Sequence, residues 1–212
     1  MTHGYPPEPP VAAQPAAAQR FRVRQKLTMM VNRYEILAVD AAGNETGLIA
    51  LAQQKRMAFK EQVTFYADES KSRPVFGFKA RSRMDLGATY DVTDAQGTAI
   101  GWFRKDFGKS LLRSTWHLGT PDGFQGMGQE RNRTVAILRR FWEVVPVLGE
   151  VPVPWLFHFD FTADDGSVVM SSTKRPALRD VYEIELPSVK GWQLDWRVAA
   201  AMAVALDALQ SR

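Results

Sequence analysis

Apolar and polar residues alternate with a period of two along most of this chain, which is the pattern of half-buried β-strands. Residues 20–26 alternate basic side chains with largely apolar ones, and in residues 75–81 Phe76 and Phe78 share the face opposite the basic residues. Residues 53–60 fit either a short helix or a strand. Further strands are expected within residues 33–43, 47–52, 62–66, 88–92, 100–103, 110–118, 155–161, 168–173 and 180–186.

Short turn sequences at hairpin spacing join these strands. The four residues from Asp40 to Gly43 and the four from Asp94 to Gly97 both begin with Asp and end with Gly. This order suits a type I turn that leaves through a left-handed residue. Ten or more short strands with such turns predict an antiparallel sandwich or barrel, and the missing strand–helix alternation argues against a doubly wound fold.

The last stretch of the chain is apolar on every side. No polar side chain lies between residues 198 and 206, so a helix here must be enclosed by protein or by lipid. The run is much shorter than the roughly 20 residues that span a bilayer, and Arg197 and Asp207 bracket it. We therefore expect a core helix over residues 195–209, with Asp195 as its N-cap. Its many Ala residues keep it thin, which suggests a barrel wrapped around a helix.

A second helix is expected over residues 134–144, where Val135, Leu138 and Phe141 recur at helical spacing and Pro146 follows. Residues 1–19 are rich in Pro and Ala and almost uncharged, which predicts a disordered tail. Residues 20–212 are expected to form a single barrel domain.

Cysteine is absent, which excludes disulfides, a thiol nucleophile and Cys-ligated zinc. The first residues lack the charged and apolar regions of a secretory signal, and no common lipidation motif is present. We expect a cytoplasmic protein with no transmembrane span, and peripheral attachment to a membrane is the alternative.

Positive charge is concentrated in the middle of the chain. Residues 71–140 contain 13 Lys and Arg and 6 Asp and Glu, a net charge of +7, whereas residues 141–212 carry −4. A basic surface suits the phosphates of lipid or nucleic acid. It equally suits solvated strand faces whose charges prevent aggregation. Because neighbouring hairpins usually pair, one outer patch is expected to collect Lys79, Arg81, Arg83, Arg104, Lys105 and Lys109.

Few residues indicate catalysis or metal binding. A Ser-His-acid site has only His117 and His158 to draw on in the expected domain, and the Gly-x-Ser-x-Gly motif is absent. His158 and Asp160 share one face of a strand, but two ligands are too few for a metal site, and the turn at residues 164–165 adds only a weak candidate.

Two further motifs have ordinary structural interpretations. Residues 123–128 are Gly-rich but follow no strand-to-helix start, so a flexible connection fits better than a phosphate-binding loop. Trp155, Phe157, Phe159 and Phe161 share one face, so core packing fits better than base stacking. We therefore predict no catalytic residue, no metal and no cofactor.

Four stretches in a fixed order carry a family resemblance: Met84–Val92, Asp94–Gly97 with Ile100–Gly101, Ser110–Trp116, and the helix from Trp196–Arg197 to Leu206–Asp207. Over about residues 20–210 the chain resembles the bacterial branch of the LURP-one-related proteins. These belong to the Tubby C-terminal-like superfamily, which also holds the phospholipid scramblases. The resemblance implies a mainly β fold, a closed antiparallel barrel of about twelve strands around a buried C-terminal helix.

The function implied by the resemblance is less specific. Tubby domains bind phosphoinositide head groups and scramblases are linked to membrane lipids, whereas the LURP-one branch has no settled activity. The chain lacks a match to the acidic calcium segment and the Cys-rich stretch of scramblases. The leading hypothesis is a non-catalytic barrel that binds anionic phospholipid or phosphoinositide head groups. The alternatives are a soluble module that binds an unidentified protein and, with less support, nucleic-acid binding or an enzyme.

Overall fold

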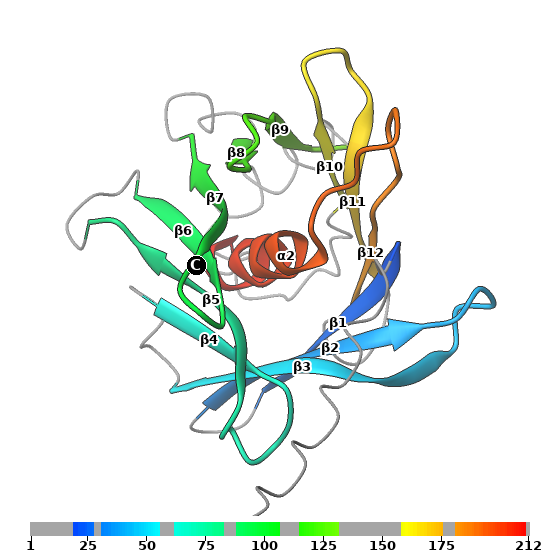
Figure 1. Cartoon of the computed structure of the whole chain (residues 1–212). Helices are drawn as coiled ribbons and strands as arrows, with labels where there is room; N and C mark the ends of the chain where they lie inside the picture. The colour runs from blue at the N-terminus through cyan, green and yellow to red at the C-terminus, as the bar shows by residue number, and fades with distance from the viewer. Residues whose placement is uncertain are drawn as a thin grey trace, which may run out of the picture.

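Twelve antiparallel strands close into a barrel around one helix (Figure 1). The structure, a computed structural model, describes residues 19–27, 31–55, 62–82, 88–106, 115–131, 158–175 and 181–210. Each strand pairs with the next in the chain, and β12 pairs with β1. The predicted closed barrel around a C-terminal helix is confirmed. Its elements are β1 (Arg20–Leu27), β2 (Val31–Val39), β3 (Glu45–Lys55), β4 (Gln62–Tyr66), β5 (Pro74–Ala80), β6 (Thr89–Asp94), β7 (Ala99–Lys105), β8 (Thr115–Gly119), β9 (Gln125–Glu130), β10 (His158–Thr162), β11 (Val168–Arg175), β12 (Val181–Glu185) and α2 (Trp196–Gln210).

Four hairpins at one end of the barrel use the same tight turn. In the turn at residues 94–98, the Gly97 amide donates to the Asp94 carbonyl at 3.1 Å and the Asp94 amide donates to the Thr98 carbonyl at 2.9 Å. Gly97 has a φ of 86°, a left-handed conformation that glycine adopts without strain. The turn at residues 40–44 repeats this pattern, which confirms both predicted turns, and the turns at residues 120–124 and 163–167 share it.

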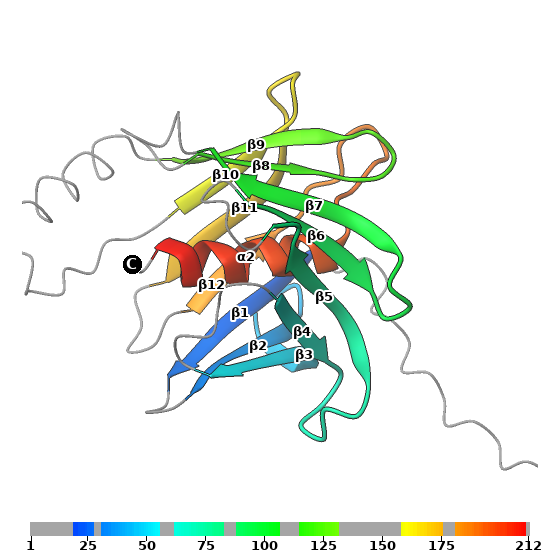
Figure 2. The same cartoon turned by 90° about the vertical axis from the view of Figure 1, so that its left-hand side faces the viewer.

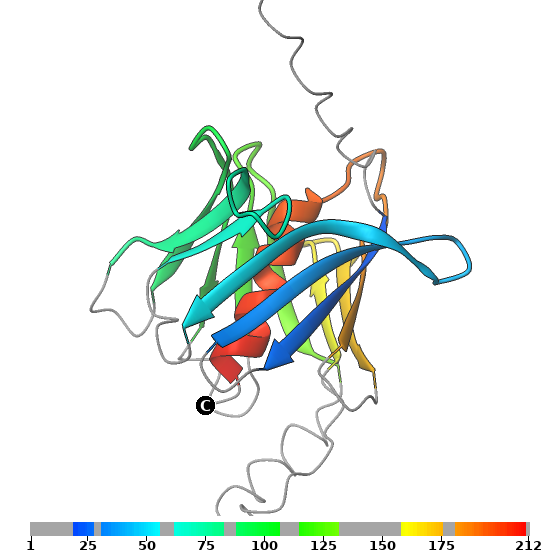
Figure 3. The same ribbon diagram turned by 90° about the horizontal axis from the view of Figure 1, so that it is seen from below.

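The segment that leads into the helix crosses this same end. The Trp192 indole donates to Asp122 at 2.7 Å and the Lys190 ammonium donates to Asp165 at 2.8 Å, and both carboxylates belong to tight turns. Helix α2 therefore enters the barrel from the turn end and runs along its interior, as Figure 2 shows. Seen from below in Figure 3, the sheet surrounds the helix.

Helix α2 is buried on every side, as its apolar sequence predicts. Residues 198–206 are exposed by between 0 and 4 %. The predicted N-cap is confirmed, because Asp195 accepts the Arg197 amide at 2.8 Å. The sheet approaches the helix closely: a Cβ on Gly101 of β7 would lie 2.7 Å from the Val198 side chain. The small side chains of the helix and the glycine on the facing strand together allow this close packing.

One carboxylate is enclosed inside the barrel near the end of the helix. Asp207 is 6 % exposed and accepts hydrogen bonds from the Tyr34 hydroxyl at 2.9 Å and the Tyr182 hydroxyl at 2.6 Å. The Gln25 amide in turn donates to the Tyr34 oxygen at 3.1 Å. These bonds join α2 to β2 and β12 at a buried position, where an unpaired polar group would be costly.

Other sequence-based predictions are confirmed only in part, because some of their residues lie outside the described ranges. The ambiguous residues 53–60 continue β3 as far as Lys55, and residues 56–61 lie outside the described residues. Phe159 and Phe161 pack in the core as predicted, whereas Trp155 and Phe157 lie outside the described residues. The same holds for the expected helix at 134–144, the first part of the expected strand at 110–118, and residues 1–18 of the expected tail. Within the described ranges, no helix combines the length and apolar character needed to cross a membrane.

We expect Ala201→Arg to prevent folding. Ala201 is fully buried on α2, so the substitution would place an unpaired guanidinium in the interior. A domain is stable by only about 5–15 kcal/mol, and this cost takes up a large part of it. The matched control is Ala99→Arg, at an exposed position of β7. Thermal unfolding followed by circular dichroism should show a cooperative transition for the control alone; a native-like melting temperature for Ala201→Arg would refute the enclosed helix.

We expect Asp207→Ala to destabilise the barrel by about 2–4 kcal/mol, because it leaves the two buried Tyr hydroxyls without their carboxylate. The triple variant Asp207→Leu, Tyr34→Phe and Tyr182→Phe removes the two hydroxyl donors and their acceptor together and should recover part of the lost stability, because the Gln25 amide then lacks its partner. Urea unfolding at equal protein concentration measures both effects. No loss in the single variant would mean that the cluster does not support the fold.

Candidate anion-binding surface

Three of the predicted basic residues share the outer face of β5–β7. Lys79 of β5 lies opposite Asp91 of β6, and Asp91 lies opposite Trp102 of β7. One row further along, the Arg81 amide donates to the Thr89 carbonyl at 2.8 Å, and Thr89 lies opposite Arg104. Residues that are paired across a sheet point to the same side. We call Lys79, Arg81 and Arg104 the outer basic face.

Lys105 does not join this face. It lies opposite Trp116, which is completely buried, and its ammonium lies 5.9 Å from the centre of the Trp116 ring. Successive side chains of a strand point to opposite sides, so Arg104 and Lys105 cannot share a patch. The structure therefore separates Lys105 from the expected patch. Arg83 and Lys109 lie outside the described residues.

Arg81 is held in a fixed orientation by a carboxylate from the neighbouring strand. Its guanidinium donates to both oxygens of Asp91, with Nε at 3.0 and 2.9 Å and Nη2 at 2.7 Å. These hydrogen bonds raise the pKa of the guanidinium, so Arg81 remains a cation. Both side chains are exposed, so the pair is open to solvent and adds little to stability. Its main effect is to orient one donor fork beside Lys79.

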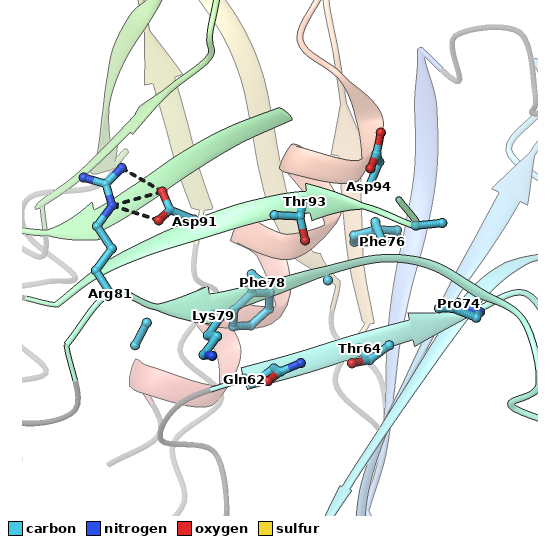
Figure 4. A pocket seen from close by; sticks show the side chains of 13 residues that line it. Gln62, Thr64, Pro74, Phe76, Phe78, Lys79, Arg81, Asp91, Thr93 and Asp94 are labelled. Carbon is cyan, nitrogen blue, oxygen red and sulfur yellow. Dashed lines mark hydrogen bonds and ion pairs between the residues drawn. The ribbon is translucent and has the colours of Figure 1, made fainter. Parts of the chain in front are cut away.

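A groove of about 470 Å³ runs along the outside of β4, β5 and β6, and the outer basic face supplies one of its ends (Figure 4). Lys79 and Arg81 line the basic end, and Pro74 and Asp94 lie toward the other end. Gly77 lines the middle, where a Cβ would come within 2.8 Å of the Val63 carbonyl oxygen. A side chain at position 77 would both strain the sheet and fill the groove.

The opposite side of the barrel carries more cations, but they are paired with carboxylates. On β1, Arg22 bonds to Glu45 at 2.8 Å and to Glu183 at 3.0 Å, and Lys26 bonds to Glu35 at 2.7 Å. Arg20, Arg24, Arg33 and Arg175 are likewise paired with carboxylates. In contrast, neither Lys79 nor Arg104 has an ion pair or hydrogen bond from its side chain within the described part of the chain.

The residues considered for a metal site have other partners. Asp160 accepts from Arg131 at 2.6 and 2.5 Å and from the Ser171 hydroxyl at 2.7 Å. Burial lowers the pKa of His158, and nearby Arg131 lowers it further, which favours the neutral ring. His117 instead contacts Asp106 at 3.1 Å. No three His, Asp or Glu side chains of the described ranges gather closely enough to hold a metal ion.

The Gly-rich run at 123–128 is neither a phosphate-binding loop nor a flexible connection. Gly123 occupies a tight turn, and Gly126 and Gly128 lie on β9. Gly128 leaves room for the ring of Phe161, which a Cβ at position 128 would overlap. The expectation of a flexible connection was wrong because these glycines serve close packing within the sheet.

The closed antiparallel barrel around a C-terminal helix defines a Tubby-like fold. Its groove and its unpaired basic residues lie on the outer wall. The family model described as LURP-one-related matches residues 48–207. This chain therefore belongs to the LURP-one-related family, which has the Tubby-like fold. A comparison with curated proteins finds no match.

Proposed function

We propose that this protein is a non-catalytic barrel that binds anionic, phosphate-bearing head groups with its outer basic face. The single observation that carries the proposal is that Lys79 and Arg104 are without counter-ions within the described residues, whereas the cations of β1 are paired with carboxylates. Unpaired cations retain their full charge for an external anion. The likeness to the Tubby superfamily supports a lipid source for that anion.

The groove gives the anion a place to bind. Lys79 offers a compact ammonium, and Arg81 presents the Nη1 side of its guanidinium, because Asp91 occupies the Nε and Nη2 side. These are the two side-chain types that bind phosphate, as a point charge and as a bidentate donor respectively. Arg104 lies one row away, on β7, where it extends the positive field along the wall. The proposal assigns binding and orientation of a head group and includes no reaction step or lipid scrambling.

We expect the triple variant Lys79→Ser, Arg81→Ser and Arg104→Ser to lose most binding to vesicles of phosphatidylcholine with one-fifth phosphatidylserine. Each basic residue at an anionic surface contributes about 1 kcal/mol, so the expected loss is roughly 100-fold. Co-sedimentation at low and physiological salt measures it, and wild-type binding should weaken as salt rises.

The matched control changes Arg20, Arg175 and Lys190 to Ser, which removes the same net charge from exposed positions elsewhere on the barrel. It should bind nearly as well as the wild type. Equal losses in the two variants would indicate attraction by net charge alone, and undiminished binding by the first variant would contradict the proposed surface.

We expect Asp91→Asn to strengthen vesicle binding by about fivefold. Asp91 neutralises Arg81 within the groove, and removing its charge makes the face more positive by one unit. The effect should vanish with pure phosphatidylcholine vesicles. Weaker binding to the anionic vesicles would mean instead that the orientation of Arg81 matters more than the added charge.

A further inference from the structure

A tryptophan lies on the outside of the barrel at the β7 edge of the outer basic face. Trp102 of β7 is directly opposite Asp91 on one side and Gly119 of β8 on the other. Arg104 follows two residues later on the same strand and points the same way. Trp102 is only partly buried, and it belongs to neither the core cluster nor the lining of the groove.

The indole of Trp102 lies across the surface of the sheet. A Cβ on Gly119 would be 2.6 Å from each of three indole atoms, Cε2, Cζ2 and Nε1. Equal distances to three atoms of the ring system show that the indole covers Gly119 instead of projecting away from the wall. The glycine thus lets a large aromatic group lie low on a convex surface next to Arg104.

This combination of groups fits a membrane surface better than a small soluble ligand. Indole rings favour the boundary between lipid and water, because one part of the ring is apolar and the N–H is polar. Lys79 and Arg104, which have no counter-ions within the described residues, complement an anionic leaflet. A small anion in the groove would meet Lys79 and Arg81 but would have no need of Trp102, which lies outside the groove lining.

We propose that Trp102 is an aromatic anchor that contacts the interface of an anionic bilayer beside the head group held by Lys79 and Arg81. This inference rests on the proposed function and adds to it that the partner is a bilayer surface. The wall formed by β5–β7 then faces the membrane, and the barrel axis lies roughly along the membrane plane. The groove recognises charge, and the indole adds contact that a soluble phosphate does not provide.

The test compares two probes with two variants. Trp102→Gln removes the indole, and Trp102→Tyr retains an aromatic ring with a polar end that also suits the interface. The probes are vesicles of phosphatidylcholine with one-fifth phosphatidylserine, by co-sedimentation, and soluble inositol hexakisphosphate, by calorimetry. We expect Trp102→Gln to lose about tenfold in vesicle binding with unchanged affinity for inositol hexakisphosphate, and Trp102→Tyr to regain most of the loss.

Other outcomes would overturn the inference. Unchanged vesicle binding by Trp102→Gln, or equal losses with both probes, would remove Trp102 as an anchor. If the triple variant of Lys79, Arg81 and Arg104 bound both probes as tightly as the wild type does, the proposed function would be overturned instead. If Trp102→Gln does not fold, brominated lipids in the vesicles provide a second measurement. They should quench the tryptophan fluorescence of the wild type more than that of Trp102→Tyr, and equal quenching would refute the anchor.

Discussion

A ring of twelve strands encloses more space than the side chains of the strands alone can fill, so the barrel depends on the apolar helix in its interior. Residues 198–206 meet the sheet on every side, which is possible because most are Ala or Val and because Gly101 allows close approach. The tight turns at one end and the Asp207 cluster at the other set the two ends of α2. With the helix along the axis, the groove and the unpaired cations lie on the outer wall.

The net charge of each part of that wall depends on how many of its cations are paired with carboxylates, as well as on how many cations it has. The β1 cations meet carboxylates from β2, β3 and β12, and Glu35 accepts from both Lys26 and Arg33. On β5–β7, Asp91 is the carboxylate that pairs with the outer basic face, and it binds only Arg81. This contrast gives the barrel a self-neutralised side and a side with residual positive charge, and it gives the lipid-binding proposal a defined surface.

Much of the fold was predictable because it follows from local patterns. Period-two alternation predicted the strands, Asp and Gly at fixed offsets predicted two tight turns, and the run without polar residues predicted the enclosed helix. The site was predictable only in part. The same alternation, extended to the end of β7, would have placed Lys105 on the opposite face from Arg104. The ion pairs of the β1 cations could not be predicted from local patterns, because Glu183 lies about 160 residues from Arg22 in the sequence. The position of Trp102 over Gly119 likewise depends on strand register.

Binding through the outer basic face requires the wall formed by β5–β7 to be the surface that meets an anionic membrane. Covalent labelling of the bound protein tests it most directly, with acetylation of lysines and oxidation of aromatic residues read by mass spectrometry. On phosphatidylserine vesicles we predict protection of Lys79 and Trp102, with Lys71 and Lys190 at the turn end still labelled as in free solution. Protection of Lys190 with undiminished labelling of Lys79, at vesicle concentrations that bind all of the protein, would contradict membrane contact through this wall.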